Sequence, residues 1–243
     1  VLTLFDTSRP DTPTLVAGYR LDHGVRALAL RQGVAGVISE TALLRVDLSA
    51  ETAPALSTIG VNLGGSRRSV VVDDILYVAD WFSGLHLYDV SKPQLPRLIS
   101  SFHTPGSPKG VLVSNGVAYV ADDDHGLQVV DVSHPRQPKL LAHLPLEGLA
   151  YTMKRVGDLL YLASHRGGFH IIDIRDPAAP KRIGGFDTPG KSWALALVGK
   201  YVFVADDNSG VLVFDVSDPA VPRQVAQFNP GGQAEDIVIR GDK

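Results

Sequence analysis

Residues 119–138 read YVADDDHGLQVVDVSHPRQP, and related stretches occur elsewhere in the chain. YVADWFSGLHLYDVSKPQLP begins at Tyr77, YLASHRGGFHIIDIRDPAAP at Tyr161 and FVADDNSGVLVFDVSDPAVP at Phe203. The aspartate after the apolar run stands at Asp6, Asp47, Asp89, Asp131, Asp173 and Asp215, so the first step is 41 residues and each later step is 42. A fixed period of this length indicates one supersecondary unit that is repeated along the chain.

Each unit contains four short runs rich in Val, Leu and Tyr. The runs VLVSNG, VAYVAD, LQVVDVS and PKLLAHL are separated by Asn-Gly, by aspartates and by prolines, which predicts a four-stranded antiparallel meander. Runs such as GVLVFDV are apolar at nearly every position, which favours sheets that are covered on both faces. The period of about 42 residues and its six aspartates therefore predict an all-β fold, a six-bladed β-propeller of four-stranded antiparallel blades.

The two ends of the chain predict how the ring closes. We expect a single domain over residues 1–243, with five complete blades within about 21–230 and a sixth blade split between residues 1–20 and 231–243. VLTLFD and PTLVAGY match strands three and four of a unit, and AEDIVIRGDK matches strand one. No segment matches the second strand of that blade, so we expect a fragment of a longer protein, or a strand supplied by another segment.

The composition excludes several classes of protein. The net charge of −3, from 23 basic and 26 acidic residues, provides no field that would attract nucleic acid or an anionic membrane. The absence of cysteine excludes disulfides, thiol nucleophiles and cysteine-ligated metals. No apolar stretch approaches the roughly 20 residues that a membrane-spanning helix needs. We therefore expect neither nucleic-acid binding nor membrane insertion.

The apolar runs LQVVD, FHIID, VLVFD and LHLYD, each followed by proline within four residues, resemble the LVIVD-repeat family of bacterial and archaeal β-propellers. The resemblance covers essentially the whole chain. The unit from Gly24 to Pro54 departs from it, because SETALLRVDLSAETAP lacks the VAD and the first proline. The resemblance implies an exported or surface-associated bacterial protein in an extracytoplasmic setting, and it carries over no catalytic residue and no cofactor.

The DDDH stretch at residues 122–125 suggests a metal site. Only Asp122 returns in other units, as Asp80 and Asp206, where an aspartate at a strand end can accept hydrogen bonds from turn amides. Asp123 and His125 are the remaining metal candidates, but the alternate ligands and distal acid of a calcium loop are absent. We expect turn chemistry and no metal. The period aspartates, such as Asp131, are expected to hold the amides of the following corner.

A variable position lies 22 residues before each period aspartate from Asp47 onward, where the innermost strand of a blade begins. Its occupants are Val25, Arg67, Lys109, Tyr151 and Trp193, and Glu235 holds the corresponding place in the incomplete last unit. We call the face of the ring on which the innermost strands begin the funnel face. These side chains could hold a polar ligand by stacking and charge-assisted hydrogen bonds. They could also form a solvated rim of mixed charge.

The hairpin tips between strands two and three are expected on the same face. The tip formed by Trp81 and Phe82 is aromatic, so a partner protein, a ligand or the next blade should cover it.

A second irregularity lies within strand one, where Lys154 and Arg155 replace the Leu112 and Val113 of another unit. Such departures mark candidate functional positions. A register slip that moves both cations to the lower rim is the alternative that we favour.

No linear catalytic motif such as GxSxG or HExxH occurs. We predict a non-catalytic binding or scaffolding module, without a cofactor, that contacts a protein partner, a neighbouring domain or a small polar ligand. The predicted binding residues are Arg67, Trp81, Phe82, Lys109, Tyr151, Trp193 and Glu235. One alternative is a hydrolase or lyase with a cross-blade metal or acid–base set from His103, Asp123, His125, His165 and Asp187. The other is a purely architectural domain, since one fold hosts many functions.

Overall fold

The computed structural model describes residues 2–6, 11–12, 14–19, 25–31, 34–39, 43–47, 56–59, 66–92 and 96–239. For most residues before Arg68 the structure describes only the backbone. None of the residues described forms a helix, so none belongs to a helix that could cross a membrane.

The described strands form one two-stranded and five four-stranded sheets, all antiparallel. The two-stranded sheet consists of β1 (Leu2–Asp6) and β2 (Thr14–Tyr19). The next sheet contains β3 (Val25–Arg31), β4 (Val34–Ser39), β5 (Leu43–Asp47) and β6 (Leu56–Ile59). It is followed by β7 (Ser66–Val72), β8 (Ile75–Asp80), β9 (Gly84–Asp89) and β10 (Arg97–Phe102).

The remaining three sheets repeat this order. The first contains β11 (Gly110–Ser114), β12 (Val117–Ala121), β13 (Leu127–Asp131) and β14 (Lys139–Leu144). The second contains β15 (Thr152–Val156), β16 (Leu159–Ala163), β17 (Phe169–Asp173) and β18 (Lys181–Phe186). The third contains β19 (Ala194–Val198), β20 (Tyr201–Ala205), β21 (Val211–Asp215) and β22 (Arg223–Phe228).

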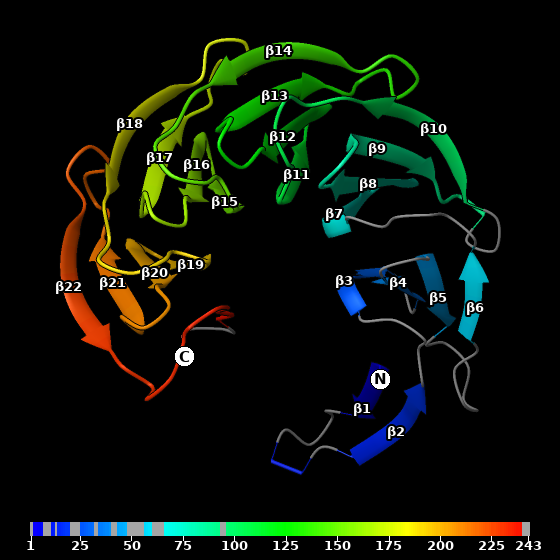
Figure 1. The fold of residues 1–243 in the computed structure, drawn as a ribbon, viewed down its shortest axis with the longest axis horizontal. Helices are drawn as coiled ribbons and strands as arrows, with labels where there is room; N and C mark the ends of the chain where they lie inside the picture. The colour runs from blue at the N-terminus through cyan, green and yellow to red at the C-terminus, as the bar shows by residue number, and fades with distance from the viewer. Residues whose placement is uncertain are drawn as a thin grey trace.

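The sheets follow one another in chain order around a common centre (Figure 1). In each four-stranded sheet the first strand, such as β11 or β15, lies innermost, and the fourth, such as β14 or β18, lies at the outside of the ring (Figure 1). This radial arrangement of four-stranded meanders is that of a β-propeller. The predicted all-β fold and its four-stranded blades are therefore confirmed.

The core lies between neighbouring sheets, which explains why the strands are apolar on both faces. Tyr119 and Leu127 pack toward the β15–β18 sheet, in a cluster with Leu160 and Leu162. The alternating residues of the same two strands, such as Val120, pack in the other direction against the β7–β10 sheet. Because successive side chains of a strand point to opposite faces, each middle sheet contributes to two cores.

Four of the period aspartates, those whose side chains the structure describes, hold the corner after strand three, as predicted. Oδ1 of Asp131 accepts a hydrogen bond from the amide of Ser133 at 2.9 Å, and Asp89, Asp173 and Asp215 accept the equivalent bonds at 2.9 to 3.0 Å. Each of them is also the register partner of the basic residue that begins strand four. These pairs are Asp89–Arg97, Asp131–Lys139, Asp173–Lys181 and Asp215–Arg223.

The favoured explanation for Lys154 and Arg155 is wrong. Lys154 is opposite Tyr161 just as Leu112 is opposite Tyr119, so β15 has the same register as β11. The Lys154 side chain is exposed in this register. The Arg155 side chain is half-buried and donates hydrogen bonds to the carbonyl of Gly157 and to the hydroxyl of Ser114 in the neighbouring sheet.

The two ends match the split blade only in part. β1 ends at Asp6 and pairs with β2, as expected for strands three and four. After β22 the chain runs inward from the outside of the ring (Figure 1). Residues 235–239, the described part of the expected inner strand, are not in a strand. The pairing of the two ends and the number of six blades therefore stay predictions.

Candidate binding site on the funnel face

Three of the predicted site residues occupy equivalent positions directly before or at the start of an innermost strand. The amide of Lys109 donates to the carbonyl of Ala121 at 2.8 Å, and the amides of Tyr151 and Trp193 make the equivalent bonds at 2.9 Å. Arg67 lies within β7, but its side chain is outside the described part. Glu235 is exposed and lies outside the described strands.

The hairpins between strands two and three reach across to the next sheet on this face. Asp123, His165 and Asp207 each form an isolated antiparallel bridge, with Ala150, Ser192 and Ala234 respectively. The three hairpin residues have φ angles of 53°, 44° and 53°, the left-handed conformation that Asp and His adopt more easily than most side chains. Each bridge partner directly precedes a funnel position, so hairpin tips and strand starts lie together as predicted.

The first half of the cluster joins an aromatic ring, a cation and a carboxylate. Nζ of Lys109 lies 3.1 Å from the centroid of the Trp81 ring, in the neighbouring sheet. The same atom lies 3.3 Å from Oδ2 of Asp123, and the two side chains are only 6% and 19% exposed. Because both contacts are largely removed from water, they are stronger than the same contacts would be on an open surface.

The second half of the cluster is aromatic and spans the β15–β18 and β19–β22 sheets. The Trp193 ring lies 5.0 Å from the Tyr151 ring and 4.6 Å from the His165 ring, with interplanar angles of 81° and 80°. Burial lowers the pKa of His165, and the positive charges of Lys191 and Arg166 lower it further. His165 is therefore a neutral hydrogen-bonding group at pH 7.

The aromatic tip at residues 81 and 82 has two environments. Trp81 is half-buried against Lys109, whereas the side chain of Phe82 is 80% exposed. The two rings are 6.4 Å apart, with an interplanar angle of 26°. The neighbouring blade thus covers part of Trp81, but it leaves Phe82 open to solvent.

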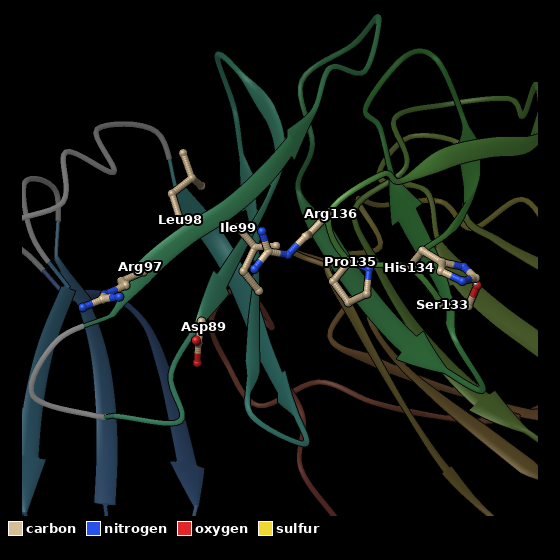
Figure 2. A pocket seen from close by; sticks show the side chains of 8 residues that line it. All are labelled: Asp89, Arg97, Leu98, Ile99, Ser133, His134, Pro135 and Arg136. Atoms are coloured by element: carbon tan, nitrogen blue, oxygen red, sulfur yellow. The ribbon is translucent and has the colours of Figure 1, made fainter.

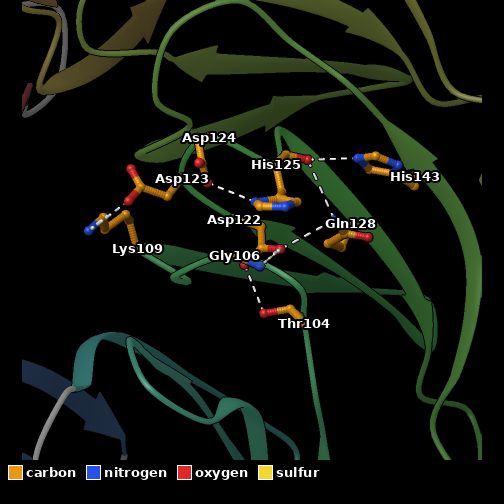
Figure 3. Close-up of polar contacts among 9 residues, drawn as sticks. All are labelled: Thr104, Gly106, Lys109, Asp122, Asp123, Asp124, His125, Gln128 and His143. Carbon is orange, nitrogen blue, oxygen red and sulfur yellow. Dashed lines mark hydrogen bonds and ion pairs between the residues drawn. The ribbon is translucent and has the colours of Figure 1, made fainter.

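The DDDH stretch is structural at its first residue. Asp122 is buried, and its carboxylate accepts hydrogen bonds from the Thr104 hydroxyl at 2.8 Å, the Gly106 amide at 3.0 Å and the Gln128 side chain at 3.2 Å (Figure 3). Thr104 and Gly106 belong to the segment that links the preceding sheet to this one. Asp122 therefore anchors the connection between two blades, and burial raises its pKa above the usual carboxyl value.

Asp206 repeats this anchor with the linker before its own sheet. It accepts hydrogen bonds from Thr188 at 2.5 Å, from the amide of Gly190 at 2.8 Å and from Ser192 at 2.9 Å. Asp80 alone among the three makes the predicted bonds to turn amides, with Phe82 at 3.0 Å and Ser83 at 3.1 Å. The prediction is thus confirmed for Asp80 and needs correction for Asp122 and Asp206, which bind the inter-blade linker.

The other residues of the stretch have separate contacts. Nδ1 of His125 lies 2.7 Å from Oδ1 of its neighbour Asp124, and the ring of His143 bonds the His125 carbonyl at 2.8 Å (Figure 3). In the described part of the chain, no three His, Cys, Asp or Glu residues are grouped so that they could hold a metal ion.

The residues of the alternative enzyme set do not all meet. His103 and Asp187 are both exposed, and they occupy equivalent linkers that lie before β11 and before β19. The β11–β14 and β15–β18 sheets lie between these two linkers (Figure 1). Among the set, Asp123 and His165 belong to the cluster described above.

A groove of about 510 Å³ on the outer side of the ring was not predicted (Figure 2). It lies between β10 and the corner after β13, and its lining is Asp89, Arg97, Leu98, Ile99, Ser133, His134, Pro135 and Arg136. The Ser100 hydroxyl donates to the carbonyl of Pro135 at 2.5 Å, which connects the two sheets beside the groove. The repeat pattern does not indicate this groove. Its lining residues come from two units, and none of them departs from the residue type expected at its position in the repeat.

Solved structures with the same fold have low sequence identity to this chain. The computationally designed Ika8 protein has a TM-score of 0.73 and 11% identity over 91% of this chain and 67% of that chain. A chain of the nidogen–laminin complex has a TM-score of 0.61 and 16% identity over 94% of this chain and 89% of that chain. The designed Ika4 protein has a TM-score of 0.53 and 10% identity over 63% of this chain and 92% of that chain. These similarities concern the fold alone.

No curated protein matches the chain significantly in sequence. The LVIVD repeat, however, is found in four consecutive copies, at residues 64–104, 105–143, 148–188 and 189–229. The copies coincide with the four sheets from β7 to β22 and together cover more than half of the chain. The chain therefore belongs to the LVIVD-repeat family.

Proposed function

We propose that this chain is a non-catalytic binding or scaffolding module that contacts a protein partner or a polar ligand through its funnel face. The observation that carries the proposal is the cluster of Trp81, Lys109, Asp123, Tyr151, His165 and Trp193. Its side chains come from four sheets and lie at positions that vary while the surrounding repeat is kept. A site assembled across blades in this way can be changed without altering the repeat that builds the fold.

We further infer that the complete ring has six blades. Asp6 ends β1 as Asp131 ends β13, and Asp6 pairs with Thr14 as Asp131 pairs with Lys139, eight residues later in both cases. The β1–β2 sheet therefore corresponds to the outer half of a blade. The inner half would come from the C-terminal segment and from a further strand, as the repeat pattern predicts.

Phe82 supports a protein partner on this face. A Phe side chain that is 80% exposed beside the half-buried Trp81 presents apolar area to water. Aromatic side chains of this kind are enriched among the residues that dominate protein–protein binding energy. An exported or surface setting, in which such a partner would be met, stays a prediction from the family resemblance.

The proposal can be tested by site-specific photo-crosslinking in the native host. A benzophenone amino acid would replace Phe82 in one variant and Val156 in a matched control. Val156 is 53% exposed and ends β15, on the face opposite the funnel face. The partner would be identified by mass spectrometry, and the unlabelled protein would be added as a competitor.

We expect position 82 to crosslink one defined partner, and the unlabelled protein to abolish the crosslink. The unlabelled variant Phe82→Ala should compete at least about tenfold less well, since a buried aromatic anchor contributes on the order of 2 kcal/mol. Equal crosslinking from positions 82 and 156, or full competition by Phe82→Ala, would contradict a partner on the funnel face.

A further inference from the structure

The funnel cluster contains an unusual number of buried polar atoms without a hydrogen-bond partner. Among the described residues, five side-chain atoms are in this state: Ser69 Oγ, Asp123 Oδ1, His165 Nδ1, His170 Nδ1 and Trp193 Nε1. Three of the five belong to the cluster, on three consecutive sheets. Buried polar atoms are almost always bonded in folded proteins, so their concentration at one place points to a group that is bound there.

The three atoms have complementary hydrogen-bonding characters. The indole Nε1 of Trp193 can only donate, whereas Oδ1 of an ionised Asp123 can only accept. Oδ2 of Asp123 pairs with Lys109, whereas Oδ1 has no hydrogen-bond partner. Nδ1 of the neutral His165 can donate or accept, according to its tautomer. A single bound group would therefore have to present both a donor and an acceptor.

The surrounding charges indicate which end of such a ligand would be cationic. Oδ1 of Asp123 favours an ammonium, because a charged donor makes the stronger bond to a buried carboxylate. At the other end, the charges of Lys191 and Arg166 act on the His165 ring, which contacts Trp193. Asp207 and Asp123 are the opposing acids there, and Asp207 is paired with Lys191 at 3.4 Å. The exposed Arg166 is therefore a positive charge near the His165 ring.

We propose that the cluster of Asp123, His165 and Trp193 binds a small zwitterion, a molecule that carries an ammonium and a carboxylate as α-amino acids do. The ammonium donates to Oδ1 of Asp123, and the carboxylate accepts from Nε1 of Trp193 and from His165. This inference rests on the proposed function of the funnel face and names one class of ligand for it.

The two tryptophans of the chain make a direct test possible, because both belong to the cluster. Protein labelled with ¹⁵N at the indole nitrogen has one NMR signal from Trp81 and one from Trp193, and the Trp81→Phe variant assigns them. The probes are glycine, β-alanine, glutamate and lysine. Acetate and methylamine each present one charge alone, and glucose presents neutral hydroxyls.

We expect at least one zwitterion to shift the Trp193 indole signal saturably, while acetate, methylamine and glucose do not at the same concentration. Asp123→Asn should weaken the binding of that zwitterion by about tenfold or more, the loss expected for one charge-assisted hydrogen bond. Asp124→Asn is the matched control, since Asp124 is the exposed neighbour in the same stretch and should bind as the wild type does.

Two outcomes would overturn the inference. The first is a Trp193 signal that no zwitterion shifts, and the second is one that acetate or glucose shifts equally well. If Asp123→Asn unfolds, Trp193→Phe removes the N–H donor while keeping a smaller aromatic side chain at the position, and calorimetry should then show a loss of at least about tenfold. A defined crosslink from position 82, together with a Trp193 indole signal that no zwitterion shifts, would refute the zwitterion as ligand but would still support a binding module.

Discussion

The ammonium of Lys109 lies 3.1 Å from the centre of the Trp81 ring, although the two residues stand in neighbouring sheets. The same ammonium pairs with Asp123 in its own sheet, so one side chain connects two blades on the funnel face. Lysine is seldom buried without such partners. Lys109 therefore contributes to the stability of the ring as well as to the candidate site.

Lys109→Met should lower the free energy of unfolding by about 2 kcal/mol, because it removes a shielded cation–π contact and leaves a carboxylate without its partner. Lys154→Met is the control, since Lys154 is exposed, and it should change stability little. Urea unfolding of both variants measures the difference. Equal effects of the two substitutions would contradict the structural role of Lys109.

Thr104→Val should cost about 1–3 kcal/mol, since it removes the hydroxyl that donates to buried Asp122 while keeping the shape of the side chain. Thr188→Val removes the equivalent donor to Asp206 and should behave similarly. The check is thermal or denaturant unfolding of each variant beside Ser107→Ala, a change in the same linker. A cost no larger than that of Ser107→Ala would argue against an anchoring role.

The raised pKa of Asp122 predicts a pH dependence of stability. The folded protein keeps the proton of this carboxyl at pH values where the unfolded chain has already released it. Because the unfolded chain then binds fewer protons, this carboxyl contributes less stability as the pH rises through its folded pKa. The Asp122→Asn variant does not titrate at this position. Relative to it, the wild type should therefore lose stability as the pH rises above the usual pKa of a carboxyl group. A difference between the two proteins that does not change with pH would contradict this prediction.

Gly126 is the last residue of the hairpin loop before β13 and has a φ angle of +70°. A Cβ atom there would lie 2.4 Å from the carbonyl oxygen of Leu144, a backbone atom of strand four. Gly157 also has a positive φ, of 57°, but nothing lies within 4 Å of an added Cβ. Gly157→Ala should cost about 1 kcal/mol from backbone strain alone, and Gly126→Ala clearly more. Denaturant unfolding of the two alanine variants distinguishes backbone strain from a collision with the Leu144 carbonyl. Equal losses of unfolding free energy would contradict the collision at Gly126.

Much of the fold was predictable because it depends on local features that recur. The period aspartates, the apolar runs and the turn residues act within one unit, so each copy of the repeat predicts the same four-stranded meander. The same period located Lys109, Tyr151 and Trp193 at the starts of the innermost strands. The four detected copies of the LVIVD repeat agree with this period.

The contacts of the site could not be predicted in the same way, because they join different units. Trp81 and Lys109 are 28 residues apart, as are His165 and Trp193, yet one pair is a cation–π contact and the other an aromatic one. The sequence alone also suggested that Asp122 binds its own turn, whereas it binds the linker from the preceding blade.

The amino-acid sequence by itself therefore determined the blade, its period and the positions that vary, because strand pairing and turns are local. Only the tertiary structure decided which variable side chains meet and which polar atoms stay without partners. The physical reason is that these contacts depend on how far each hairpin reaches over the next sheet and on how the side chains pack there. That packing brings Trp81, Lys109, Asp123, Tyr151, His165 and Trp193 together as a candidate binding cluster, and it makes Asp122, the first residue of DDDH, an anchor between two blades.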